Sequence, residues 1–220
     1  SRNPEEEYTM LNGLLKQANE EKDLGVIITK DLKTTRQCLE AAKKANKMLG
    51  LISRNIECKS QKTILKLYNA LVRPLLEYAV QFWSPNLAKN KDCLERVQRR
   101  ATKLIPSLRN KSYEERLKEC DLFSLDKRRH RGDMIQVFKI LTNIDKVQEE
   151  MYFQRNDDIR TRNNGFKLRG ALFKTNIAKN FFTNRVIEDW NKLPAGVVGS
   201  PSVQTFKTRL DKYYKTNNIL

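Results

Sequence analysis

The chain has 220 residues, enough for one large domain or two modest ones, and its hydrophobic content of 39% allows an ordinary buried core. No apolar run approaches the roughly 20 residues that span a bilayer, which excludes a transmembrane segment. The residues before Tyr8 are polar and acidic, so they do not form a secretory signal. Because the chain starts with Ser1 instead of Met, we expect a fragment or a processed product.

Charge is the strongest signal in the composition. The 43 Lys and Arg residues exceed the 26 Asp and Glu residues, which gives a net charge of +17. Self-repulsion of this size disfavours a compact state unless a polyanion or counterions screen it. Nucleic acid is the usual partner, because cationic side chains release counterions from its phosphates. The rival partner is an acidic membrane surface, but the sequence has no amphipathic anchor or lipidation signal. We expect RNA, an RNA–DNA hybrid or DNA as partner, no membrane, and an intracellular, nuclear or cytoplasmic location.

The cysteines predict no metal centre. Cys38, Cys58, Cys93 and Cys120 are far apart in the sequence without a C-x-x-C pair, and His130 is the only histidine. A zinc site would need ligands from several separate elements. We therefore expect four reduced and mostly buried thiols, as in an intracellular protein.

The chain begins with a region predicted to be β structure, residues 8–29. Asn12-Gly13 follows residues 8–11 and is a favoured hairpin turn, since both residue types tolerate positive φ. Residues 24–29, Leu-Gly-Val-Ile-Ile-Thr, predict a buried strand that is rich in β-branched residues.

After Asp31 the pattern becomes helical. A first helix carries an apolar stripe, with Lys43, Lys44 and Lys47 beside or opposite it. A long second helix begins at Ser60 as N-cap, bends at Pro74 and ends at 83–85. The predicted stripes are Leu39, Ala42, Ala45, Leu49 and Ile52 in the first helix, and Ile64, Leu67, Tyr68, Leu71, Leu75, Tyr78, Ala79 and Phe82 in the second.

Further helices follow. A third helix packs through Leu94, Val97, Ala101 and Leu104 and stops before Pro106. A short helix covers 113–118, and Ser124 caps a longer one. The latter is predicted to bury Met134, Val137, Phe138 and Leu141.

The last part of the chain is predicted to be a smaller α/β region. Residues 145–165 are polar and predict a loop or linker, and 166–169 could form a short strand. A helix through Ala178, Phe182, Val186 and Trp190 follows, and Ser200-Pro201 is predicted to start a final one. The latter buries Val203, Phe206 and Leu210. The fold class is therefore mainly α, a helical bundle with an N-terminal β hairpin and this smaller C-terminal region.

The cations are arranged in clusters that suit a nucleic acid. Arg96, Arg100 and Lys103, with Arg99 adjacent, fall opposite the apolar face of the third helix. Any single cluster can be an ordinary solvated helix face, but Arg forks onto phosphate oxygens and these clusters are rich in Arg. Phosphate contacts carry no sequence information, so we expect affinity rather than base specificity. A second cluster is Lys127, Arg128, Arg129, His130 and Arg131, and a diffuse third one is Arg155, Arg160, Arg162, Lys167, Arg169, Lys174, Lys179 and Arg185.

No catalytic centre is visible in the sequence. A polymerase or nuclease needs clustered carboxylates to hold Mg²⁺. The adjacent pair Asp157-Asp158 is flanked by arginines and is predicted to lie in a turn. P-loop, nucleophile-elbow and H-E-x-x-H patterns are also missing from the sequence.

Four segments resemble the C-terminal part of reverse transcriptases from LINE-type (non-LTR) retrotransposons, jockey-like branch. They occur in family order across nearly the whole chain, and their combination is specific. These segments are 21–28, Glu-Lys-Asp-Leu-Gly-Val-Ile-Ile; 71–78, Leu-Val-Arg-Pro-Leu-Leu-Glu-Tyr, with Trp83; 94–103, Leu-Glu-Arg-Val-Gln-Arg-Arg-Ala-Thr-Lys; and 185–194, Arg-Val-Ile-Glu-Asp-Trp-Asn-Lys-Leu-Pro, with Phe206, Lys207 and Leu210.

The resemblance implies an order of regions. Residues 1–30 would be the last hairpin of the palm, with Leu24, Gly25 and Val26 in the primer-grip strand. Residues 31–145 would be the thumb, which holds template–primer duplex by its backbone, and 146–220 a C-terminal extension. The aspartates that bind Mg²⁺ in the family precede this region, so no cofactor is expected in this chain and the palm would hold the metal.

Three functions remain open. The chain can be a detached nucleic-acid grip without chemistry, or part of an active reverse transcriptase when an upstream palm is joined to it. It can also be a domesticated protein that binds other proteins through exposed apolar surface.

Overall fold

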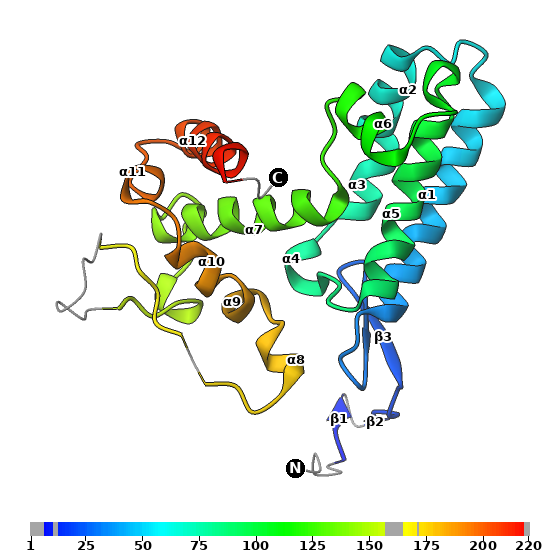
Figure 1. Ribbon diagram of the computed structural model, residues 1–220. Coiled ribbons are helices and arrows are strands. Elements are labelled where there is room, and N and C mark those ends of the chain that lie inside the picture. The colour runs from blue at the N-terminus through cyan, green and yellow to red at the C-terminus, as the bar shows by residue number, and fades with distance from the viewer. Residues whose placement is uncertain (1–6, 11–12, 157–164, 171, 218–220) are drawn as a thin grey trace.

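The structure is a computed structural model that describes residues 7–10, 13–156, 165–170 and 172–217 (Figure 1). It is mainly helical, as the periodicity predicts, with two small antiparallel hairpins at the N-terminus. The strands are β1 (Thr9–Met10), β2 (Gly13–Leu14), β3 (Glu20–Asp23) and β4 (Val26–Thr29). Asn12, half of the predicted turn, lies outside the described residues, and Gly13 already belongs to β2.

The prediction that 24–29 is one strand is wrong at its start. Leu24 and Gly25 form the turn between β3 and β4, with φ of 44° and 86°, and the strand begins at Val26. Two consecutive residues with positive φ are what a tight two-residue hairpin turn requires. The Tyr78 hydroxyl donates to the Leu24 carbonyl at 2.9 Å and ties this turn to the helices.

The first helices form a bundle. They are α1 (Thr35–Asn55), α2 (Gln61–Leu67), a π-helical turn η1 (Tyr68–Val72), α3 (Arg73–Glu77), α4 (Val80–Trp83), α5 (Ala88–Lys103), a 3₁₀ turn η2 (Pro106–Leu108) and α6 (Tyr113–Glu119). Ser60 caps α2 as predicted, since its hydroxyl accepts from the backbone N–H of Thr63. The wide turn η1 ends two residues before Pro74, which lacks a backbone N–H to continue the regular hydrogen bonding.

The π turn changes which residues are buried in this segment. Because the turn is wider than in an α-helix, residues four apart stay on one face, and the core receives Ile64, Tyr68, Val72, Leu76 and Val80. The predicted core positions Leu71, Tyr78 and Phe82 are instead exposed. A separate difference concerns α1, in which the predicted core residue Leu39 is exposed and Cys38 and Ala41 are buried instead.

The second half of the chain surrounds α7 (Leu125–Leu141), which runs from one half of the molecule into the other (Figure 1). Ser124 caps this helix as predicted. The remaining elements are a 3₁₀ turn η3 (Glu149–Met151), α8 (Asn176–Lys179), α9 (Phe182–Arg185), α10 (Ile187–Asn191), α11 (Ala195–Val198) and α12 (Val203–Thr216). The single helix predicted through Ala178 and Trp190 is therefore divided into three short helices, α8, α9 and α10.

Two hydrophobic cores result. The first contains buried residues from Val26 to Leu125, and the second contains buried residues from Met134 to Tyr214. In the second, Phe138 of α7 stacks on Phe206 of α12 with ring centroids 4.3 Å apart. The final helix is capped by Ser202, two residues after the predicted cap Ser200. The Ser200 hydroxyl instead donates to the Val197 carbonyl. Both cores meet along α7.

The predicted strand at 166–169 is reduced to a single bridge between Arg155 and Leu168 in the part of the chain that the structure describes. Trp190 and Asn191 hold this segment, because the Trp190 indole donates to the Phe166 carbonyl and the Asn191 amide pairs with the Leu168 backbone. None of the described helices is long and apolar enough to cross a membrane.

Candidate nucleic-acid interface

The predicted cations of α5 form an exposed stripe. Arg96, Arg100 and Lys103 follow one another by four and three residues, which places them on one side of a helix. The opposite side buries Leu94, Val97 and Ala101, as expected from the sequence. Arg96 and Lys103 are exposed, as are Arg99 and Arg100. Lys89 extends this stripe by two turns toward the start of the helix.

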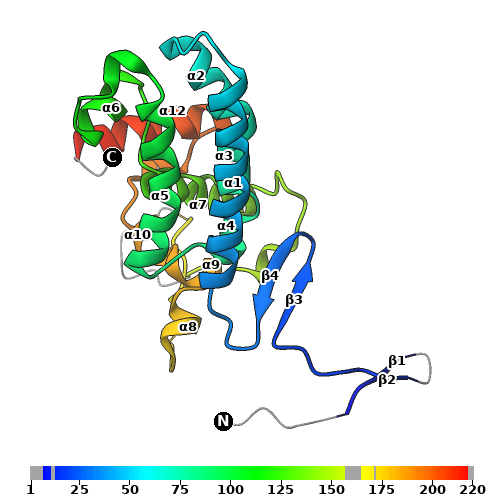
Figure 2. The same ribbon diagram turned by 90° about the vertical axis from the view of Figure 1, so that its right-hand side faces the viewer.

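Helix α1 lies beside α5 and runs in the same direction (Figure 2). The Asn90 amide donates to the Thr35 hydroxyl near the start of both helices, and Arg100 donates to Asn46 farther along. Exposed cations of α1, Lys43, Lys47 and Arg54, therefore lie on the helix that flanks the α5 stripe. We call the combined surface the α1–α5 face, made of Lys43, Lys47, Arg54, Lys89, Arg96, Arg99, Arg100 and Lys103.

Few acids accompany these cations. Within the two helices the acids are Glu40, Asp92 and Glu95, and Glu95 is buried. Asp92 binds two members of the face, Arg96 at 2.6 Å and Arg99 at 2.8 Å between nitrogen and carboxylate oxygen. The hydrogen bond from Arg96 and the contact with Arg99 hold the pKa of Asp92 below its usual value. The α1–α5 face therefore has a net positive charge, and Asp92 partly neutralises two of its arginines.

Buried Glu95 fixes α5 to its neighbours. Its carboxylate accepts from the Tyr113 hydroxyl of α6 and from the Leu125 backbone N–H at 3.0 Å, at the start of α7. Gln98, also buried, accepts from the Tyr68 hydroxyl at 2.6 Å and donates to the Phe123 carbonyl. These polar contacts orient α5 so that its other side carries the cations outward.

The arginines of the second predicted cluster are half-buried or buried and form ion pairs within the fold. Arg128 forms a two-pronged ion pair with Glu77 of α3, and Arg131 forms one with Asp211 of α12 at 2.6 and 2.9 Å. Arg129 is 3% exposed. Arg128 and Arg131 thus connect α7 to α3 and α12 and do not belong to the open α1–α5 face, whereas Arg129 pairs with Asp126 of its own helix. Lys127 is exposed.

The third cluster is engaged in part, and its members Arg169, Lys174 and Lys179 are exposed. Arg185 binds Asp133 at 2.9 Å, and Arg155 binds Glu149 at 2.6 Å, measured between nitrogen and oxygen. Arg160, Arg162 and the pair Asp157-Asp158 lie outside the described residues. The described residues contain no group of three His, Cys, Asp or Glu side chains placed to hold a metal ion.

The proposed primer-grip residues occupy two different environments. Leu24 and Gly25 form an exposed turn, and Val26 is buried against the first core. The hairpin packs at the end of the α1–α5 pair, where the Ile27 backbone N–H donates to the Gln37 side chain at 2.9 Å. Of this trio, Leu24 is the one whose side chain is open to a partner.

Four cations of the α1–α5 face are not predicted as site residues from the sequence: Lys43, Lys47, Arg54 and Lys89. Their helical spacing is visible in the sequence, but that spacing does not reveal that α1 and α5 are neighbours. The four cysteines are free thiols, of which Cys38 and Cys120 are buried and Cys58 is exposed. Comparison with known proteins gives no match to any family model, curated protein sequence or solved structure.

Proposed function

We propose that this chain is a nucleic-acid-binding part of a retrotransposon RNA-directed DNA polymerase (reverse transcriptase). In this role it grips template–primer duplex through phosphate contacts and carries no catalytic residues of its own. The α1–α5 face carries the proposal, because two adjacent helices line up eight cations and Asp92 is paired with two of them. The family order of the four resembling segments supports the assignment to a polymerase, with 31–145 as a thumb-like region.

The length of α5 relative to the spacing of phosphates supports a duplex as the ligand. A helix of 16 residues such as α5 is about 24 Å long, at 1.5 Å per residue. A nucleic-acid duplex presents one charge per about 1.7 Å of its axis, so several phosphates can lie along such a helix. Arginine and lysine side chains that contact phosphates hold the backbone of a duplex and carry no information on its base sequence.

The direct test is binding of an RNA–DNA hybrid duplex at two salt concentrations, followed by fluorescence anisotropy. Six neutralised phosphates give a slope of about −5 in log K against log salt concentration. Absent binding, or binding that does not change with salt, contradicts the proposal. Parallel titrations with duplex RNA and duplex DNA determine which of the three partners is preferred.

A second candidate is an active reverse transcriptase formed when an upstream palm is joined to this chain. It is favoured by exposed apolar side chains around the hairpin and α4, where Leu24 is 84% and Phe82 is 65% exposed. A nearby cavity of about 380 Å³ is lined by Ile27, Leu32 and Phe181 among others. Primer extension with and without an upstream aspartate-bearing palm tests this role, in which the palm would supply the Mg²⁺ site. The same apolar surface is what a domesticated protein-binding module would use.

A further inference from the structure

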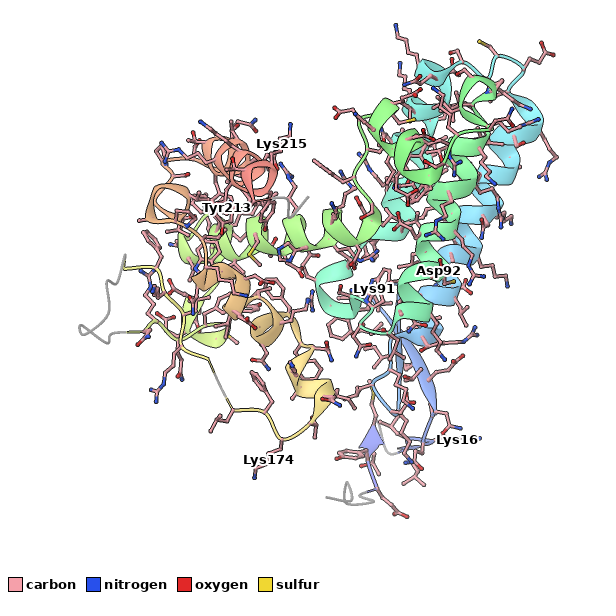
Figure 3. The ribbon with its side chains drawn as sticks, in the orientation of Figure 1. Lys16, Lys91, Asp92, Lys174, Tyr213 and Lys215 are labelled. Atoms are coloured by element: carbon pink, nitrogen blue, oxygen red, sulfur yellow. The ribbon has the colours of Figure 1, made fainter. Side chains whose placement is uncertain are left out.

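A second cationic site lies away from the α1–α5 face, in a cavity of about 630 Å³ between the two cores. Its wall is formed by the first half of α7, the 84–86 loop, the 185–193 segment and α12. Lys91 of α5 and Tyr213 of α12 line it from two different elements (Figure 3). The volume falls within the range of about 300 to 1,000 Å³ that is usual for small-molecule sites.

Arg129 in the wall of this cavity has hydrogen-bonding capacity that the fold does not use. Its side chain is 2% exposed, and Nη2 donates to Asp126 at 3.2 Å. Its Nε and Nη1 atoms have no hydrogen-bond partner within the described part of the chain. Leaving a buried charged donor unsatisfied costs free energy, which a ligand with acceptor oxygens can recover.

Tyr214 of α12 also lines this cavity and carries a second unsatisfied polar group. The side chain is 2% exposed, and its hydroxyl finds no partner among the described residues. Its ring packs near His130, with centroids 5.5 Å apart. Two separate helices therefore each place one unpartnered polar side chain around one cavity.

The charges of the cavity favour an anion. Lys91, Lys127, Arg129, Arg185 and Lys192 give five positive charges, against Asp126, Asp133 and Asp189, which leaves a balance of +2. Each acid already pairs with at least one cation, and Asp126 pairs with Arg129 as well as with Lys91. Lys91 binds Asp126 at 3.1 Å, Arg185 binds Asp133 at 2.9 Å, and Lys192 lies 3.5 Å from Asp189. The exposed Lys127 and the unpartnered Nε and Nη1 atoms of Arg129 are thus left for a ligand.

We propose that this cavity binds the phosphate group of a nucleotide unit, with Arg129 and Tyr214 as its principal donors. A phosphate carries several acceptor oxygens and matches a guanidinium fork. The remaining volume accommodates the sugar and base, beside the half-buried ring of Tyr213, which suits stacking. A free nucleotide and the phosphorylated end of a strand share this chemistry.

The cavity is separate from the α1–α5 face, although α5 contributes residues to both. Lys91 binds Asp126 of α7, whereas its neighbour Asp92 binds Arg96 and Arg99 of the face. The two side chains, both labelled in Figure 3, thus belong to two different surfaces. Phosphate binding in the cavity therefore does not depend on duplex binding by the face.

The test is isothermal titration of the full chain with ATP. We expect one site per chain, and Arg129→Met should weaken it at least about tenfold, since hydrogen bonds to charged groups are strong. Tyr214→Phe should weaken binding severalfold while the melting temperature is unchanged or higher, because its hydroxyl has no partner to lose. This variant keeps the test informative if Arg129→Met fails to fold.

Lys215→Ala on the exposed side of α12 is the matched control and should leave the affinity within about twofold. Lys103→Glu should also leave ATP binding unchanged, which separates the cavity from the face. No ATP binding, or equal binding by wild type, Arg129→Met and Tyr214→Phe, overturns the proposal.

A final comparison identifies the source of the phosphate. Four-nucleotide RNAs with a 5′-phosphate or a 5′-hydroxyl are titrated into wild type and Tyr214→Phe. A preference for the 5′-phosphate that Tyr214→Phe reduces assigns the site to strand ends. ATP binding without that preference assigns it to free nucleotides, and both results uphold a phosphate site.

Discussion

Arg185 of α9 forms a two-pronged ion pair with Asp133 of α7, with Nε–Oδ2 at 2.9 Å and Nη2–Oδ1 at 3.0 Å. The same Nη2 donates to the Gln81 carbonyl of α4 at 3.0 Å. The two side chains are 17% and 7% exposed, so the pair is shielded from water. Because α4 packs in the first core and Arg185 borders the second, a single guanidinium joins the two halves of the molecule.

We predict that Arg185→Met destabilises the protein by about 3 kcal/mol, because it leaves the buried Asp133 carboxylate without its cation. Urea denaturation followed by circular dichroism measures this change. Lys192→Met, which removes an exposed ion pair with Glu188, is the control and should leave the midpoint unaltered. Equal midpoints for Arg185→Met and wild type would show that the pair does not hold the halves together.

Glu95 predicts a pH dependence of stability. Burial raises the pKa of this carboxyl, against the opposing hydrogen bonds from Tyr113 and the Leu125 backbone. Since the raised pKa means that the folded state takes up a proton more readily than the unfolded state, acidification toward that pKa favours folding. Wild type should therefore gain stability relative to Glu95→Gln between about pH 7.5 and pH 5. Denaturant titrations at both pH values measure the difference, and a constant gap contradicts the assignment.

The turn between β3 and β4 predicts a stabilising substitution. Leu24 has φ of 44°, which is unfavourable for a leucine, and its side chain is 84% exposed. Leu24→Asn should raise stability by about 1 kcal/mol, because Asn tolerates left-handed backbone better. Gly25→Val at φ of 86° should lower it. Thermal unfolding of the three proteins checks the order, and a less stable Leu24→Asn contradicts it.

Local signals explain what was predictable from the sequence. The caps Ser60 and Ser124, the end of α5 before Pro106 and the buried side of α7 all depend on residues within a few positions of one another. The outward cations of α5 follow from the same helical spacing. These features need no knowledge of the remaining chain.

Long-range contacts explain the rest. The sequence predicts Arg128 and Arg131 to be available for phosphate binding. Their ion-pair partners, Glu77 and Asp211, are 51 and 80 residues away in the sequence. The pairing of α1 with α5 likewise depends on packing. The sequence predicts a strand at Leu24-Gly25 because the apolar residues around these two outweigh the turn signal of a single glycine.

Removal of the Asp92 charge is predicted to strengthen the binding of an RNA–DNA hybrid. Its carboxylate holds Arg96 and Arg99 in ion pairs on the α1–α5 face. Asp92→Asn removes the negative charge and frees both arginines, so affinity for an RNA–DNA hybrid should rise severalfold and the salt slope should steepen. Glu119→Gln, an acid of α6 that is not part of the face, is the control for net charge. Similar effects from both substitutions would count against a local role for Asp92.

Charge reversal of Arg96, Arg100 and Lys103 tests the central claim most directly. The comparison is a triple reversal of Lys207, Lys212 and Lys215 on α12, which lowers net charge equally. Hybrid-duplex affinity at several salt concentrations should fall by orders of magnitude in the α5 variant, with the slope reduced by about 3 for three lost phosphate contacts. The α12 variant should lose only the general attraction of net charge. Equal losses in both variants, or no loss in the first, would contradict phosphate binding by the α1–α5 face.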